Sequence, residues 1–379
     1  MEKEKTERNS LNKIFIIAMV LVIVLLILNN FMLNERRIKV AEAKEIFKEQ
    51  SRPAELQLIK ITPSNCEDCF DIEKAIIELK NQNINITSEE TFSINSQQGK
   101  EIISKYDIKK LPTMIISGEV NKSEQLVNYF NQKGEISENN FVFTALNPPY
   151  LDLSSNQIKG QVQIKNIIDS SCNKCVSLSS VSSLLKEQGV FIKNEKSVEY
   201  NSDEGRDLIN KFEIKEVPAV LISDDIDYYS QVKTALTQSG AVKKSGFYAI
   251  HSTVPPYRDL SQNRIIGMIE VIYLTKNDCT ECYSVSVNKN ILLRFGIVIN
   301  NEKTYDINSP EGKQFIQKYN IKKVPIIILS PDANYYLSLK QAWRSVGSTE
   351  SDGWFVMRNP EAIGTYWDIE LNKIVEANN

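Results

Sequence analysis

Six cysteines, arranged as three Cys-x-x-Cys pairs, are the residues of this chain whose type and spacing could do chemistry. They use every cysteine of the 379-residue sequence: Cys66 and Cys69, Cys172 and Cys175, Cys279 and Cys282. Two thiols at this spacing can close a short disulfide or bind a soft metal ion. The sequence therefore predicts thiol chemistry at three places in the chain.

The three pairs keep a regular spacing with three prolines. The first cysteines are 106 and then 107 residues apart, and a proline follows each of them by 46 residues. These prolines are Pro112, Pro218 and Pro325. Because pairs and prolines share one register three times, the chain is predicted to be a tandem repeat.

Three interpretations of the cysteine pairs stay open at this point: redox-active dithiols, inert structural disulfides and metal sites. A closed zinc site needs four ligands, whereas each repeat offers two thiols with no histidine nearby. No metal site is therefore predicted. Thiol exchange and a structural disulfide remain as the two main alternatives.

Charge and composition narrow the classes of function further. The formal net charge is −3, which argues against a nucleic-acid partner because that partner favours a concentrated basic face. The single histidine, His251, leaves almost nothing for histidine-based catalysis. No Gly-rich phosphate loop, Ser-His-Asp set or carboxylate dyad stands out, and no cofactor is predicted.

Each cysteine pair is expected to be positioned by the same elements. An apolar strand precedes each pair, and Asn65, Ser171 and Asp278 are predicted to cap a helix whose first turn carries both cysteines. A second strand, a second helix, the proline, a strongly apolar strand and a final amphipathic helix follow. This order predicts three α/β sandwiches.

A further phrase recurs after each repeat, twice between repeats and once at the C-terminus. It is a Tyr-x-Asp sequence followed four residues later by Asn, at Tyr150–Asn156, Tyr257–Asn263 and Tyr366–Asn372. These connectors are apolar and lack Gly/Ser runs, so we expect ordered packing elements that fix neighbouring domains. The predicted boundaries are 53–159, 160–266 and 267–379 for the three domains.

The N-terminal region carries an apolar run long enough to cross a bilayer. Residues 14–33 are predicted to form a transmembrane helix, after a short tail at 1–13 and before a charged stalk at 34–52. A cleaved signal peptide is the alternative. Flanking lysines and arginines do not decide the orientation, but cysteines found only as close pairs favour an oxidising compartment outside the cytoplasm.

With the cysteine pair at a helix start and an aromatic-x-Ile-x-x-Leu/Val-Pro phrase ending at each proline, residues 53–379 resemble the thioredoxin superfamily in three copies. The arrangement resembles multi-domain protein disulfide isomerases. The resemblance implies that Pro112, Pro218 and Pro325 are cis prolines whose neighbouring backbone holds an extended substrate chain. It also implies that Cys66, Cys172 and Cys279 attack a substrate disulfide, and that Cys69, Cys175 and Cys282 resolve the mixed disulfide.

The chain departs from the superfamily in two ways. The buried acid that reductases carry six residues before the first cysteine is replaced by Lys60, Asn166 and Tyr273. The residues between the cysteines are Glu-Asp, Asn-Lys and Thr-Glu. Acidic neighbours oppose thiolate formation and a lysine favours it, so three unequal redox potentials are expected, with the middle pair the most oxidising.

The sequence thus predicts a membrane-anchored thiol–disulfide oxidoreductase that oxidises, isomerises or reduces exported or unfolded proteins and exchanges electrons with an unidentified redox partner. The competing prediction is a non-catalytic binding or chaperone module with structural disulfides. Both place the three domains outside the cytoplasm.

Overall fold

The computed structural model describes residues 19, 21, 29, 31–137, 139–252 and 254–377. By their contacts these form two compact units, Met1–Ile158 and Lys159–Asn379. Most of the predicted transmembrane helix at 14–33 lies outside the described residues. Among the residues that are described, no helix is both long enough and apolar enough to cross a membrane.

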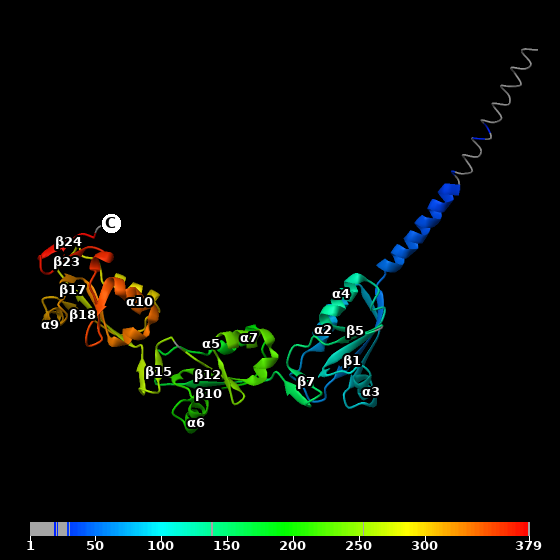
Figure 1. Ribbon diagram of the computed structural model, residues 1–379, viewed down its shortest axis with the longest axis horizontal. Helices are drawn as coiled ribbons and strands as arrows, with labels where there is room; N and C mark the ends of the chain where they lie inside the picture. Colours follow the sequence, from blue (N-terminus) through cyan, green and yellow to red (C-terminus); the bar gives the residue numbers. More distant parts are fainter. Residues whose placement is uncertain are drawn as a thin grey trace, which may run out of the picture. The chain divides into compact units, whose positions relative to one another are not determined.

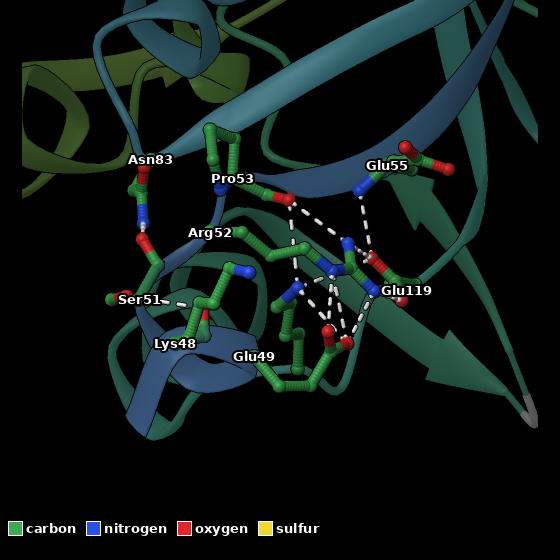
Figure 2. A network of polar contacts seen from close by, with 9 residues as sticks. Lys48, Glu49, Ser51, Arg52, Pro53, Glu55, Asn83 and Glu119 are labelled. Carbon is green, nitrogen blue, oxygen red and sulfur yellow. Dashed lines mark hydrogen bonds and ion pairs between the residues drawn. The ribbon is translucent and has the colours of Figure 1, made fainter. Parts of the chain in front are cut away.

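Residues 31–51 form a helix that ends against the first repeat. The Arg52 guanidinium, just after its last turn, bonds both carboxylate oxygens of Glu119 at 2.7 and 2.5 Å and also pairs with Glu49. The same Glu119 carboxylate accepts the backbone N–H of Glu55 at 2.9 Å (Figure 2). Proline at position 53 disfavours helical geometry at Arg52, so the helix stops where this contact begins.

The first repeat is built on one five-stranded sheet of order β2-β1-β4-β6-β5. β1 is parallel to β2 and antiparallel to β4, and β6 is antiparallel to both β4 and β5. Its elements are β1 (Ala54–Thr62), α2 (Ile72–Lys80), β2 (Ile84–Ser93), α3 (Gln97–Lys105), β3 (Lys110–Leu111), β4 (Thr113–Gly118), α4 (Glu124–Lys133), β5 (Gly134–Ser137) and β6 (Asn140–Phe143).

Alternating side chains of the buried strands divide the core of this repeat into two layers. Leu56 and Leu58 face α2 and α4, whereas Ile61 and Ile115 belong to the cluster that includes α3. Figure 1 shows α2 and α4 on one side of the sheet and α3 on the other. The first repeat is therefore a three-layer α/β/α sandwich, as predicted.

The second compact unit contains the same arrangement twice, in sheets of order β10-β9-β12-β14-β13 and β18-β17-β20-β22-β21. The second repeat comprises β9 (Val162–Ile168), α5 (Ser180–Glu187), β10 (Ile192–Glu199), α6 (Asp203–Phe212), β11 (Glu216–Val217), β12 (Ala219–Ser223), η1 (Asp224–Tyr228), α7 (Ser230–Gln238), β13 (Val242–Lys244) and β14 (Phe247–His251). The third comprises β17 (Ile269–Thr275), α8 (Ser286–Arg294), β18 (Ile299–Asp306), α9 (Pro310–Tyr319), β19 (Lys323–Val324), β20 (Ile326–Leu329), η2 (Pro331–Tyr335), α10 (Leu337–Val346), β21 (Gly347–Thr349), β22 (Phe355–Met357) and η3 (Pro360–Ala362).

The end of each repeat differs from the prediction. The last helix was expected to close the repeat, but α4, α7 and α10 are each followed by a β-hairpin that adds two strands to the sheet. In the first repeat Phe141 of β6 is fully buried and stacks on Phe130 of α4 at 4.4 Å between ring centroids. Burying these aromatic side chains stabilises the hairpin against β4, which would otherwise be an exposed edge.

The recurring connectors form ordered hairpins, as expected, and their role in fixing neighbouring domains stays a prediction. They are β7 (Tyr150–Asp152) with β8 (Gln157–Lys159), β15 (Tyr257–Asp259) with β16 (Arg264–Ile266), and β23 (Tyr366–Asp368) with β24 (Lys373–Val375). Asp152 accepts turn N–H groups from Ser154 and Ser155, and Asn156 takes the left-handed backbone conformation at φ 52°. The repeated Asp and Asn of the phrase are thus turn residues.

Candidate functional site

All three cysteine pairs are disulfide-bonded, with Cα–Cα distances of 5.3, 5.4 and 5.4 Å. Each disulfide lies in a turn after the first strand of its repeat. The helices α2, α5 and α8 begin at Ile72, Ser180 and Ser286, beyond the second cysteine. The prediction that both cysteines lie in the first helical turn was therefore wrong.

Backbone hydrogen bonds to the connectors explain this difference. The N–H after the second cysteine donates to a connector carbonyl instead of a helical one: Phe70 to Pro149 at 2.7 Å, Val176 to Pro256 at 3.2 Å, and Tyr283 to Thr365 at 2.9 Å. In the first repeat the helix starts after this bond, where Asp71 accepts from the N–H of Glu73 and acts as the N-cap. Asn65, Ser171 and Asp278 cap no helix among the described residues.

The three prolines share one backbone geometry, and in the second repeat the proline lies beside the disulfide. The peptide bonds 111–112, 217–218 and 324–325 are all cis. In the second repeat a cavity of about 260 Å³ is lined by Cys172, Cys175 and Pro218 together, along with Asn166 and Asp169. Here the structure brings the predicted cysteines and their proline into one site.

Each repeat therefore combines a parallel strand pair, a Cys-x-x-Cys turn after the first of these strands, and a cis proline immediately before a strand that runs antiparallel to it. Each repeat has a thioredoxin-like fold.

No protein-family model and no curated protein matches the sequence. Among solved structures, the chain is similar to full-length ERdj5 at 12% identity, covering 83% of this chain and 43% of that one, with a TM-score of 0.16. It is similar to human ERp44 at 12% identity (74% and 77% covered, TM-score 0.13) and to the alkylhydroperoxide reductase AhpF of Enterococcus faecalis at 14% (45% and 82%, TM-score 0.14). At these TM-scores the whole chains do not superpose, and the fold assignment rests on the topology of each repeat.

The connectors of the thioredoxin-like repeats also occupy the strand edge next to each proline. The residue before each cis proline pairs in antiparallel register with the middle residue of the Tyr-x-Asp phrase: Leu111 with Leu151, Val217 with Arg258, and Val324 with Trp367. An extended substrate could form these backbone hydrogen bonds with the residue before the cis proline only after the connector strand had separated from that residue.

The cysteines of the three thioredoxin-like repeats differ in their exposure to solvent. Cys172 is only 8% exposed, whereas the other five cysteines are half-buried. Asp169, three residues before Cys172, is also buried and binds Arg258 of the connector at 2.6 Å. Burial raises the pKa of Asp169, but hydrogen bonds from Ser171 and Arg258 outweigh it and hold the pKa below its ordinary value.

The third repeat has a different contact at the same place. Lys276, three residues before Cys279, lies 4.5 Å from the ring centroid of Trp367 and forms an ion pair with Asp278. This hydrogen bond lowers the pKa of Asp278. The Asp278 carboxylate, which was expected to cap a helix, thus forms an ion pair with Lys276 instead.

These contacts with the connectors were missed by the sequence reasoning, which treated the connectors as packing elements alone. A signal was present in the repeats. The residue three before the first cysteine and the middle residue of the Tyr-x-Asp phrase change together: Pro63 with Leu151, Asp169 with Arg258, and Lys276 with Trp367. At these equivalent positions the first repeat has two apolar residues, the second has an ion pair and the third has a cation–π pair.

Proposed function

We propose that this chain is a thiol–disulfide oxidoreductase with three Cys-x-x-Cys sites that acts on exported or unfolded proteins. The observation that carries the proposal is the cavity of the second repeat, where both cysteines and the cis proline line one space of about 260 Å³. A cavity at a disulfide gives a substrate sulfur a place to approach the bond, which a purely structural disulfide does not need.

The reaction follows the general course of thiol–disulfide exchange. A substrate thiolate attacks one sulfur of the disulfide, forming a mixed disulfide and releasing the other cysteine as a thiolate. A second substrate thiolate then attacks the mixed disulfide, so that the substrate gains a disulfide and the repeat keeps two thiols and two electrons. Reduction of a substrate is the reverse, with Cys66, Cys172 and Cys279 as the proposed attacking residues and Cys69, Cys175 and Cys282 as the resolving ones.

The cis prolines Pro112, Pro218 and Pro325 are proposed to position the substrate beside the sulfurs. Membrane attachment through residues 14–33 and a location of the repeats outside the cytoplasm are part of the same proposal. Their support is the apolar run of the sequence and the exclusive use of cysteines in close pairs. An external redox partner, which returns electrons or removes them, completes the cycle.

A second candidate function is a binding module with structural disulfides. Two observations favour it: the connector strands fill the strand edge beside each cis proline, and Cys172 is nearly buried. A module of this kind would hold extended or unfolded segments on other surfaces of the repeats.

A glutathione redox titration of the full-length chain separates the two candidates. After alkylation, chymotrypsin gives peptides that keep each pair intact, whereas trypsin would cut at Lys174 between Cys172 and Cys175. Rapid exchange with potentials between roughly −120 and −270 mV supports the oxidoreductase. Slow exchange with potentials below about −300 mV for all three pairs rejects it in favour of the binding module.

A further inference from the structure

The connector of the second repeat brings a buried charge pair to the first cysteine of that repeat. Arg258, on β15, donates from Nε to Asp169 Oδ2 at 2.6 Å and from Nη2 to Ser171 Oγ at 3.2 Å. Only 12% of the Arg258 side chain and 2% of the Asp169 side chain are exposed. Such a pair interacts through a medium of lower dielectric than water, so its charges act strongly on their surroundings.

Asp169 connects this pair to the dithiol by short bonds. Its carboxylate accepts the N–H of Ser171 at 3.0 Å, its carbonyl oxygen accepts the N–H of Cys172 at 3.1 Å, and it lines the cavity that both cysteines line. The turn that carries Cys172 is therefore held by Asp169, and Asp169 is held by the connector. The Arg258 guanidinium also lies 4.9 Å from the centroid of the Tyr200 ring, which is a cation–π contact.

The other charged groups around this turn are less well placed to act on Cys172. Glu199 binds the backbone and hydroxyl of Ser170, and Lys174 donates to the carbonyl of Ile299 at 3.0 Å. Lys174 is exposed, so its charge is screened by solvent. The charges of Asp169 and Arg258 are the ones shielded from water beside the buried cysteine.

The third repeat supports the same relationship with different chemistry. Trp367, which occupies the position of Arg258, lies over Lys276, which occupies the position of Asp169. Only 13% of the Lys276 side chain is exposed. The residue three before the first cysteine is therefore cationic in the third repeat and anionic in the second.

We propose that the connector residue at this position, Arg258 in the second repeat and Trp367 in the third, is a positioning residue that sets the thiol–disulfide equilibrium of its repeat through the residue three before the first cysteine. The proposal rests on the proposed oxidoreductase function and deepens it. Because the cysteines do not lie at a helix N-terminus, the stability of the Cys172 thiolate depends on these side chains instead of on a helix dipole.

The sign of each effect follows from the charges. Removing the guanidinium while keeping the carboxylate disfavours the Cys172 thiolate, which makes the disulfide more stable and the pair less oxidising. Removing the carboxylate charge while keeping the guanidinium favours the thiolate and makes the pair more oxidising. A contact that only held the turn in place would give changes of the same sign for both substitutions.

The test compares Arg258→Met, Asp169→Asn and their combination in the full-length chain, with the equilibrium constant against glutathione measured for each pair by alkylation and chymotryptic peptide mapping. Opposite shifts of roughly three- to tenfold are expected for the middle pair in the two single variants, with the double variant within about twofold of the parent. Arg258→Lys keeps the charge and should stay close to the parent. The pairs at Cys66 and Cys279 are internal controls, since their constants should not change, and hydrogen exchange of peptides from the second repeat reports that this repeat is folded in each variant.

Shifts of the same sign in the two single variants, or shifts below about twofold while the parent pair exchanges freely, would overturn the positioning role and leave the oxidoreductase proposal intact. A parent protein in which none of the three pairs exchanges rejects both proposals together, whereas one in which only the middle pair does not exchange overturns the positioning role of Arg258 alone. Where Arg258→Met unfolds the second repeat, Asp169→Asn should still make the middle pair more oxidising, by about threefold or more, while Arg258→Lys stays near the parent, and an unchanged or less oxidising pair in Asp169→Asn overturns the positioning role.

Discussion

The phenolic hydroxyl of Tyr283 donates a 2.8 Å hydrogen bond to the carbonyl oxygen of Pro325, so the residue after Cys282 is tied directly to the cis proline of the third repeat. The same hydroxyl accepts the side-chain N–H of Asn288 at 3.1 Å, and Asn288 is only 2% exposed. Burial raises the pKa of Tyr283 to about 12, and the hydroxyl therefore remains a donor through the neutral and mildly alkaline range. In the other repeats Phe70 and Val176 stand at this position.

Tyr283→Phe should destabilise the third repeat by about 1–2 kcal/mol, because both Pro325 and Asn288 lose a partner. Hydrogen exchange in denaturant, read from peptides of each repeat, is the suitable measurement since three domains do not share one unfolding transition. The first and second repeats should keep their exchange rates. An unchanged third repeat would show that water replaces the hydroxyl at no cost.

Serine substitutions test the assigned roles of the two cysteines in each pair. With a disulfide-bonded model peptide and the reduced protein, Cys175→Ser should accumulate a mixed disulfide on Cys172, because the resolving thiol is missing. Cys172→Ser should accumulate much less, by about tenfold or more. Mass spectrometry of the alkylated complex gives the answer, and the reverse preference would exchange the two roles. Cys69→Ser and Cys282→Ser extend the comparison to the other repeats.

Gly312→Ala is expected to destabilise the third repeat although alanine is the better helix former. A Cβ on Gly312 would lie 2.0 Å from the carbonyl oxygen of Asp306, so helix α9 and strand β18 would have to separate. Overpacking of this kind costs about 1–3 kcal/mol, whereas helix propensity alone predicts a gain of about 1 kcal/mol.

The sign of the change in unfolding free energy therefore decides between the two effects in Gly312→Ala. Gly296→Asn is a matched control in the same repeat, because Gly296 has φ 71°, which asparagine tolerates, and a Cβ added there would meet no atom within 4 Å. This control should be nearly neutral. A stabilised Gly312→Ala variant would mean that the strand and helix move apart easily.

Asp332→Ala should loosen the connector that enters the third repeat. The Asp332 carboxylate accepts the N–H of Gly267 at 2.9 Å and pairs with Arg264 at 3.0 Å. Charge-assisted hydrogen bonds of this kind contribute about 1.5–3 kcal/mol, so tryptic cleavage after Arg264 should become about tenfold faster or more.

Asp225→Ala provides the matched control for the connector. Asp225 accepts the N–H of Gly160 at 2.9 Å in the equivalent place of the second repeat. Its loss should accelerate cleavage at Lys159 and leave cleavage at Arg264 unchanged. Equal effects of both variants at both sites would indicate general unfolding instead of local release.

Acidification should release the helix at 31–51 from the first repeat. The hydrogen bonds from Arg52 and from the backbone of Glu55 lower the pKa of Glu119 to about 2 from an ordinary value of 4.5. Because the folded-state pKa is depressed, the stabilisation is complete above pH 4.5 and is lost as the pH falls toward 2. The protection factors of residues 49–55, which correct hydrogen exchange for the intrinsic pH dependence of amide exchange, should stay constant from neutral pH down to the upper end of this window and fall within it.

Glu119→Gln should show the lowered protection factors already at neutral pH, with little further change on acidification. The side chains of this ion pair are about one-third exposed, so added salt should weaken the contact in the parent protein. If the protection factors of residues 49–55 change with neither the substitution nor the pH, the apolar contacts around Pro53 hold the helix without the ion pair.

Much of the fold was predictable because the information is local and repeated three times. The buried strands β4, β12 and β20 follow the prolines as continuous apolar runs, and α2 buries Ile72, Ile76 and Leu79 at helical spacing. The serine at the start of α3, α6 and α9 accepts the N–H of the glycine three residues later, as a cap does. Spacing, caps and apolar runs are properties of short segments, which a sequence shows directly.

The start of the cysteine helices was not predictable in this way. Asn65, Ser171 and Asp278 have the chemistry of caps, but the N–H groups at Phe70, Val176 and Tyr283 bond to connector carbonyls about 80 residues further along the chain. A local cap competes with a distant acceptor there, and only the folded arrangement decides which one wins. The strands after α4, α7 and α10 were missed for a related reason, because short hairpin strands owe their stability to the sheet edge they cover.

The sequence by itself determined the three cysteine pairs, their prolines, the number of repeats and the α/β character of each, because these follow from residue type and spacing. The tertiary structure decided what surrounds each disulfide. Arg258 is 89 residues from Asp169, and Trp367 is 91 residues from Lys276. Such contacts form when a connector strand pairs beside the cis proline, and this pairing depends on the packing of the whole repeat.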